Sequence, residues 1–207
     1  MRRVASLPAA FGRFAEMGGV LNFAVFEEAQ GTEEETLSVI PAVLAPGRSF
    51  DARRLAELGR RRIGEAAFFG DWYDFASGML LRDGDVVLND GTQLHRPRLA
   101  DLAGREIRSA SAALPQTGAG GNFAYAFSWT PYGLSGGPLE IQAIFEQIRD
   151  FILPPDEDSQ IFDWSDARLT EVSDYFDDGA EWWGVFLFSI YAPALRRLIL
   201  IAGSTTD

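Results

Sequence analysis

WWGVFLFSIY, residues 182–191, and RLILIA, residues 197–202, are the two segments that decide the fold of this chain. Both are almost continuously apolar, and Pro193 lies in the short stretch between them. A strand that is buried on both faces has this pattern, whereas a strand with one wet face alternates apolar and polar residues. The two segments therefore predict an antiparallel pair at the centre of a sheet.

The rest of the chain predicts hairpins and isolated helices around that centre. Apolar residues recur at helical spacing after Pro138 and stop at Pro154-Pro155, which predicts a helix over residues 138–153. We expect a second helix near residues 51–67 and a single strand over residues 123–129. We also expect two hairpins. One joins strands 20–28 and 36–44, and the other covers residues 79–89 with its turn at Asp83-Gly84. Such a mixture predicts a single α+β domain over residues 1–207, with a mainly antiparallel sheet and a few flanking helices.

Composition excludes several kinds of chemistry. The absence of cysteine excludes disulfides, thiolate nucleophiles and cysteine-ligated zinc. All 18 basic residues are arginine, so a Schiff-base lysine and a phosphate-loop lysine are excluded as well. A net charge of −12 disfavours nucleic acid and anionic membranes as partners. We expect no cofactor, because no cofactor-binding motif is present.

The sequence also predicts a cytoplasmic protein. Arg2-Arg3 begins like a signal peptide, but Arg13 and Glu16 interrupt the apolar run that would have to follow. The most apolar stretch, residues 182–195, is too short to span a bilayer and contains a proline.

Most of the negative charge is concentrated in one segment. Residues 150–181 hold eleven carboxylates and a single arginine, Arg168, and aromatic residues lie among them. Protein interfaces gain energy from tyrosine and tryptophan side chains that are ringed by polar groups, and complementary charge speeds encounter with a basic partner. The segment therefore predicts a surface for a basic protein, with candidate partner-binding residues Trp164, Asp166, Asp174, Tyr175, Phe176, Asp177 and Asp178.

The same segment has a second interpretation, in which its aromatic rings point into the core and its acids are merely solvated. The leading functional hypothesis is a non-enzymatic domain that binds a basic protein through residues 156–181. A bacterial immunity protein, or another inhibitor of a basic toxin domain, fits that description.

The sequence leaves three alternatives open. An enzyme of unrecognised family would use His95, the only histidine, together with a carboxylate such as Glu181 as acid and base. A homo-oligomeric structural protein would place the arginine-rich helix near 51–67 of one copy against the acidic segment of another. A calcium or magnesium site would use hard oxygen ligands from Asp156, Asp158 and Asp163.

Overall fold

The central pair of strands lies where the sequence predicts it. In the computed structural model, which describes residues 1–112 and 114–205, β10 (Val185–Ala192) pairs antiparallel with β11 (Arg197–Ser204) over their full lengths. All residues of β10 except Tyr191 are buried, as expected for a strand that is covered on both faces. The prediction of this hairpin is confirmed.

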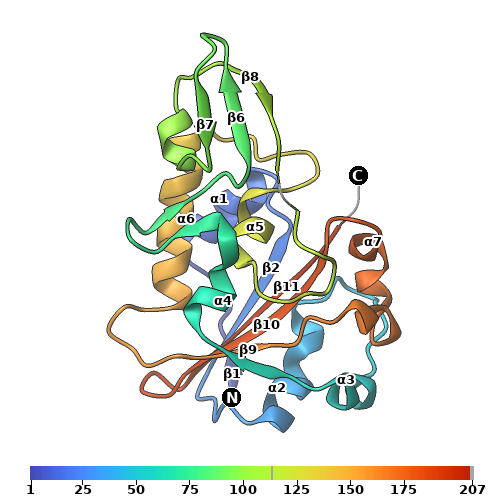
Figure 1. The fold of residues 1–207 in the computed structure, drawn as a ribbon. Coiled ribbons are helices and arrows are strands. Elements are labelled where there is room, and N and C mark those ends of the chain that lie inside the picture. The colour runs from blue at the N-terminus through green and yellow to red at the C-terminus, as the bar shows by residue number, and fades with distance from the viewer. Residues whose placement is uncertain (113, 206–207) are drawn as a thin grey trace.

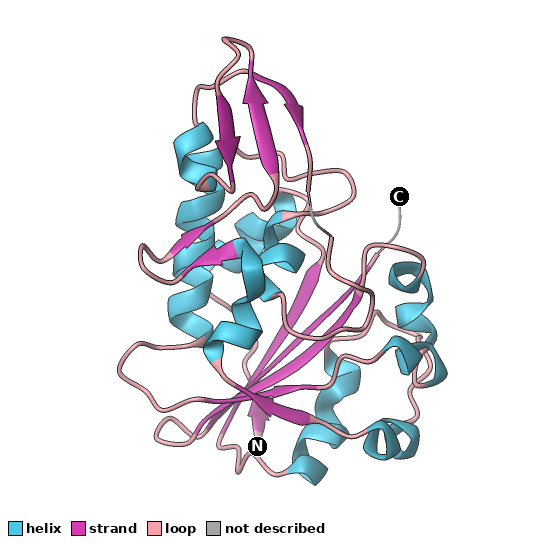
Figure 2. Cartoon of the chain, viewed as in Figure 1, coloured by secondary structure: helices cyan, strands magenta, loops and turns pink. Residues whose placement is uncertain are grey.

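Four more strands extend the pair into a six-stranded sheet. Its order is β1-β2-β11-β10-β9-β3, and every neighbouring pair is antiparallel. Helices cover both faces of this sheet (Figures 1 and 2). The fold is therefore α+β, with the sheet as its middle layer. The added strands are β1 (Arg2–Arg3), β2 (Leu21–Glu27), β9 (Gln160–Asp163) and β3 (Arg61–Ile63).

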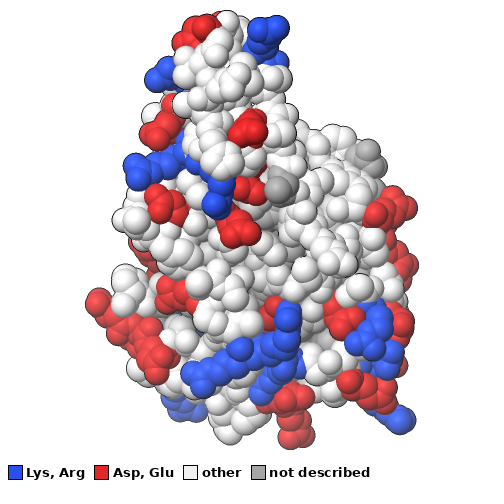
Figure 3. Space-filling view, in the orientation of Figure 1, with Lys and Arg blue, Asp and Glu red and all other residues white. Residues whose placement is uncertain are grey.

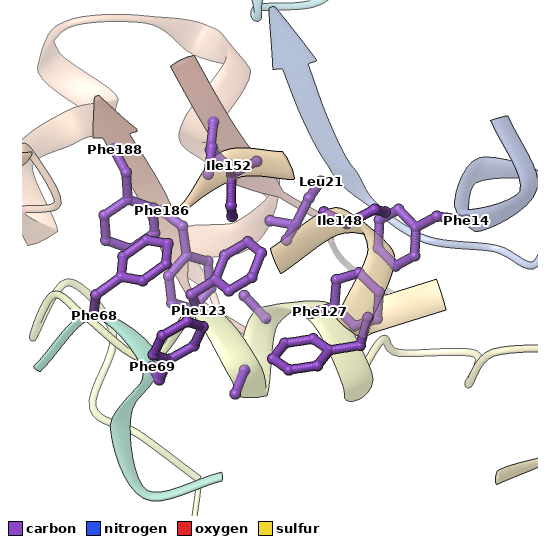
Figure 4. Packing of buried hydrophobic residues seen from close by; sticks show 14 of the residues in the cluster. Phe14, Leu21, Phe68, Phe69, Phe123, Phe127, Ile148, Ile152, Phe186 and Phe188 are labelled. Atoms are coloured by element: carbon purple, nitrogen blue, oxygen red, sulfur yellow. The ribbon is translucent and has the colours of Figure 1, made fainter. Parts of the chain in front are cut away.

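One face of the sheet carries the larger apolar core. Aromatic rings dominate it: Phe14 stacks on Phe127 at 4.2 Å between ring centroids, and Phe68 stacks on Phe123 at 4.8 Å. Figure 4 shows these rings interleaved between the helices and β10. Offset aromatic pairs of this kind add to the free energy gained from burial. The helices on this face are α1 (Ala9–Glu16), α4 (Glu65–Phe69), α5 (Phe123–Ser128) and α6 (Pro138–Ile152).

The other face carries a second core beneath shorter helices. Trp164, Phe176 and Leu187 lie in this core and are almost fully buried. Its elements are α2 (Glu33–Val39), α3 (Ala52–Leu58), α7 (Asp177–Ala180) and the 3-10 turns Ile40–Ala42, Ala167–Glu171 and Asp174–Phe176. Much of the acidic segment therefore belongs to this layer.

A small three-stranded sheet projects from the top of the molecule in Figure 1. The strand β6 pairs with β7 on one side and with β8 on the other. These strands are β6 (Asp85–Leu88), β7 (Gln93–His95) and β8 (Ile107–Ala110). A separate two-stranded sheet consists of β4 (Tyr73–Asp74) and β5 (Met79–Leu80). The remaining elements of this region are the 3-10 turns Gly70–Trp72 and Leu99–Leu102. None of the helices in the described residues is long and apolar enough to cross a membrane.

Four predicted elements are wrong. The segment 36–44 continues a helix instead of forming a strand, because Thr32 Oγ1 accepts the N–H of Glu35 and three glutamates occupy the first turn. Residues 123–128 form α5, in which Phe123, Tyr125 and Phe127 are buried together with the alanines between them. A helix that is surrounded by core needs no polar face, so the alternation of aromatics and alanines does not identify a strand there.

The other two errors concern turns. The helix near 51–67 ends at Leu58, because Gly59 takes a φ of +80° and the chain continues into β3 and α4. Asp83-Gly84 does not close a hairpin: β5 pairs with β4, while β6 pairs with β7 across a turn at Asn89-Asp90-Gly91. The helix expected at 138–153 is confirmed as α6.

Candidate partner-binding surface

The acidic segment is divided between two places on the molecule. Residues 150–158 run from the end of α6 into the loop that leads to β9, whereas residues 166–181 form the turns and the short helix α7 over the second core. Figures 1 and 3 show this separation, with carboxylates over the loop at the left and over α7 at the right, and arginines between them. The segment is therefore not one continuous patch.

The three predicted aromatic anchors are buried. Trp164 is 1% exposed, Tyr175 is 7% exposed and Phe176 is fully buried, and all three belong to the second core. Trp164 Nε1 donates to Ser189 Oγ at 2.9 Å, and Tyr175 OH accepts from Asn22 Nδ2 at 3.1 Å. The prediction that these rings are exposed anchors is therefore wrong, and whether the carboxylates beside them bind a partner stays a prediction.

The rings turn inward because of the local backbone. Trp164 follows β9, and its N–H bonds to Leu187 of the neighbouring strand, so it continues the sheet with its side chain on the second core. Tyr175 and Phe176 occupy a single 3-10 turn, Asp174–Phe176, in which the N–H of Tyr175 donates to Ser173 Oγ at 3.1 Å. Burial raises the pKa of Tyr175 to about 12, so this phenol is neutral at physiological pH.

The carboxylates of the second part lie on the outside of those turns. We call Asp166, Glu171, Asp174, Asp177, Asp178 and Glu181 together the acidic face. Four of them are exposed, Glu171, Asp177, Asp178 and Glu181, and Asp166 and Asp174 are partly buried. Because buried rings fix the turns from below, the backbone that carries these carboxylates has a defined position although the carboxylates lie at the surface.

Arginines of the same chain neutralise part of the acidic face. Arg54 of α3 donates from Nε to Glu171 at 2.8 Å. Arg48 lies 3.8 Å from Asp174 and 4.0 Å from Asp178. A third arginine, Arg168, forms a bidentate ion pair with Asp166. The six carboxylates of the acidic face thus lie among three arginines. The arginine-rich region and the acidic segment meet within one chain, so their complementarity does not require a second copy.

Two of these carboxylates have a structural role. Asp174 Oδ1 accepts from the backbone N–H of Ser49 at 2.8 Å and from its hydroxyl at 2.9 Å, and these hydrogen bonds, with the nearby Arg48, lower the pKa of Asp174. The side chain of Arg168 likewise lowers the pKa of Asp166. By contrast, the side chain of Asp177 has no hydrogen-bond or ion-pair partner among the described residues.

The three aspartates of the metal alternative do not come together. Asp163 is buried, and its carboxylate accepts from Arg61 Nη2, Gly121 N and Ser165 N, each at 2.9 Å. Asp156 and Asp158 are exposed in the loop before β9. No group of three or more potential metal ligands occurs in the described part of the chain. The proposed ligand set is therefore wrong, because hydrogen bonds inside the protein already use the Asp163 oxygens.

The residues of the enzyme alternative lie in different parts of the molecule. His95 belongs to β7 of the projecting sheet, and its Nδ1 lies 2.9 Å from Asp85 Oδ1, with both side chains largely exposed. Glu181 follows α7, which Figure 1 places on the other side of the molecule. The structure does not bring this predicted acid and base into one site.

Sequence reasoning missed two relationships. The partner of His95 is Asp85, and a correct pairing of β6 with β7 places these two residues opposite each other. The hydrogen bond between Asp163 and the glycine-rich loop of residues 115–121 was also missed, although an aspartate at a buried position of an alternating strand signals a need for buried donors. No family model, curated protein or solved structure matches this chain.

Proposed function

We propose that this chain is a non-enzymatic protein-binding domain that receives a basic partner on its acidic face. The observation that carries the proposal is the placement of exposed carboxylates on turns that buried aromatic residues hold in place. A backbone that is already ordered presents these charges to a complementary surface without the entropy loss of ordering a loop on binding. An immunity protein that neutralises a basic toxin domain is the form of this function that we favour.

Electrostatics would act mainly on the rate of encounter. Exposed carboxylates in water contribute little to affinity individually, but a concentrated field of one sign accelerates association and makes it depend on salt. Asp177 and Asp178 are the best candidates for this role, because Asp177 has no internal partner and Asp178 lies at the limit of ion-pair distance from Arg48. Asp174 and Asp166 contribute charge but also hold the fold.

A pair of matched variants tests the proposal. Asp177→Lys with Asp178→Lys reverses two charges on the acidic face. Asp156→Lys with Asp158→Lys makes the same change in net charge at two exposed positions of the separate loop before β9. Each protein serves as bait for quantitative capture from the cells in which the chain occurs, and captured basic proteins are then measured as purified pairs.

We expect a basic protein that wild type and the 156/158 variant capture and that the 177/178 variant loses. Its association rate with the 177/178 variant should fall about tenfold at low ionic strength and depend less on salt. Equal effects of both variants would show that only net charge matters, and an unchanged association rate for the 177/178 variant would refute the acidic face as the binding site.

A further inference from the structure

The first strand covers only one end of β2. Arg2 and Arg3 pair with Glu27 and Phe26, and the last contact is the hydrogen bond from Val4 N to Val25 O at 2.8 Å. On its other side, β2 pairs with β11 as far as Leu21. Residues 21–24 therefore form an edge of the sheet with no strand beside it in the described chain.

The backbone of Phe23 points out of this open edge. In an antiparallel sheet, the N–H and C=O of one residue point to the same side, and alternate residues point to alternate sides. Val25 O accepts from Val4 N, so the backbone N–H and C=O of Val25 point toward β1. Phe23 is two residues away from Val25, so its N–H and C=O point to the same side. Within the described chain, the N–H and C=O of Phe23 have no hydrogen-bond partner.

A hollow lies on each face of the sheet beside this edge. One has a volume of about 440 Å³ and is on the side of the first core, where Leu7 packs; the other, of about 470 Å³, is on the side of Val43 and Leu44. Phe23 and Arg3 line both hollows. Successive side chains of an added strand point to opposite faces of the sheet, so neighbouring residues would enter one hollow each.

The charge at the edge is positive although the whole protein is acidic. Arg3 lines both hollows, and its Nη2 donates to Ala42 O at 3.2 Å, which leaves further donors of its guanidinium group for a ligand. Apart from Arg3 and Asn22, the described side chains that line the hollows are apolar. A ligand that fits both features is apolar with a carboxylate at one end.

We propose that the open edge of β2 binds an extended segment of another protein by strand addition. Backbone bonds to Phe23 would supply pairing, neighbouring apolar side chains would fill the two hollows, and an acidic side chain would face Arg3. This site is separate from the acidic face and prefers the opposite charge, so it stands or falls independently of the proposed function.

The test uses a displayed library of random eight-residue peptides selected on the whole protein. Selected peptides should carry neighbouring apolar residues and an acidic residue, and binding should slow amide hydrogen exchange at Phe23 by about tenfold or more. Arg3→Glu should weaken binding by about fivefold to tenfold, whereas Arg2→Glu, at a residue that lines neither hollow, should change it little.

Amide exchange keeps the proposal falsifiable without a core mutation. Failure to enrich any peptide would overturn it, as would enriched peptides that leave exchange at Phe23 unchanged. A peptide that protects Phe23 but binds Arg3→Glu as well as wild type would overturn the acidic requirement.

Discussion

The carboxylate of Asp163 and the backbone N–H of Gly121 lie 2.9 Å apart, although 42 positions separate the two residues in the chain. The same oxygen accepts from Arg61 on β3, so one buried group ties the edge strand to the glycine-rich loop. Gly120 fits beside this contact because a Cβ there would collide with both the Asp163 carboxylate and the Arg61 guanidinium. Asp163 is thus a structural residue that organises this end of the sheet.

Replacement of Asp163 should destabilise the protein. In Asp163→Ala, the N–H groups of Gly121 and Ser165 remain buried without an acceptor, which costs about 1–3 kcal/mol for each. Urea unfolding should show the loss, and hydrogen exchange at Gly121 should accelerate. Asp158→Ala, at an exposed position, is the control and should change stability by less than about 0.5 kcal/mol. A stable Asp163→Ala protein would contradict this role.

Trp164 and Ser189 should behave as a coupled pair. The indole N–H donates to the hydroxyl at 2.9 Å, and both residues are 1% exposed. Either Trp164→Phe or Ser189→Ala should lower the free energy of unfolding by about 1–3 kcal/mol. The double variant should lose about 1 kcal/mol less than the sum of the two single losses, and additive losses would argue against the hydrogen bond.

Two glycine substitutions should have opposite effects. Gly12 lies within α1, and a Cβ there would meet nothing within 4 Å, so Gly12→Ala should stabilise the protein by about 0.5–1 kcal/mol. At Gly179, a Cβ would lie 3.0 Å from Ser204 Cα and closer still to the carbonyl oxygen of Gly184. Gly179→Ala should therefore destabilise it by about 1–3 kcal/mol. Thermal unfolding of both variants measures whether the first substitution raises stability and the second lowers it.

Asp174 should make stability depend on acid pH. Its pKa is lower in the folded state than in the unfolded state, chiefly because Ser49 N–H donates to it, so its contribution is present above the unfolded pKa and is lost as pH falls through the folded pKa. Asp174→Asn should thus be less stable than wild type near pH 7, and the difference should shrink in acid. Urea midpoints of both proteins, measured from pH 7 to pH 2.5, test this expectation, and Asp177→Asn is the control. If the difference in stability between wild type and Asp174→Asn stays constant over this range, the Asp174 carboxylate does not cause the pH dependence.

The sequence predicted helices and strands well where the pattern of apolar residues along the segment matches its burial. Residues 185–192 and 197–204 are almost continuously apolar because both faces of each strand are covered, and α6 has a clear apolar stripe between its prolines. Prediction failed for α5, because a helix enclosed by core lacks a polar face, and for α2, where the cap at Thr32 outweighed the apolar residues that follow. These errors arise from tertiary surroundings and capping, which periodicity does not reveal.

The candidate surface was less predictable than the fold. Charge density along the chain identified the acidic segment, but not its division between two places on the molecule. Aromatic residues beside acids looked like anchors, yet each ring of Trp164, Tyr175 and Phe176 fills the second core. Whether a side chain points inward depends on which strand it neighbours, and that information lies in pairings such as Trp164 with Leu187.

The strand order also has a consequence for synthesis on the ribosome. The strand β2 is synthesised well before its long-range partner β11, which comprises residues 197–204. Until those residues leave the exit tunnel, β2 has only the two-residue β1 beside it among the described strands, and the whole edge that later pairs with β11 is open to other nascent chains. The central layer therefore cannot form until residues 197–204 are available, and chaperones that shield exposed strands should matter most for this protein during that interval.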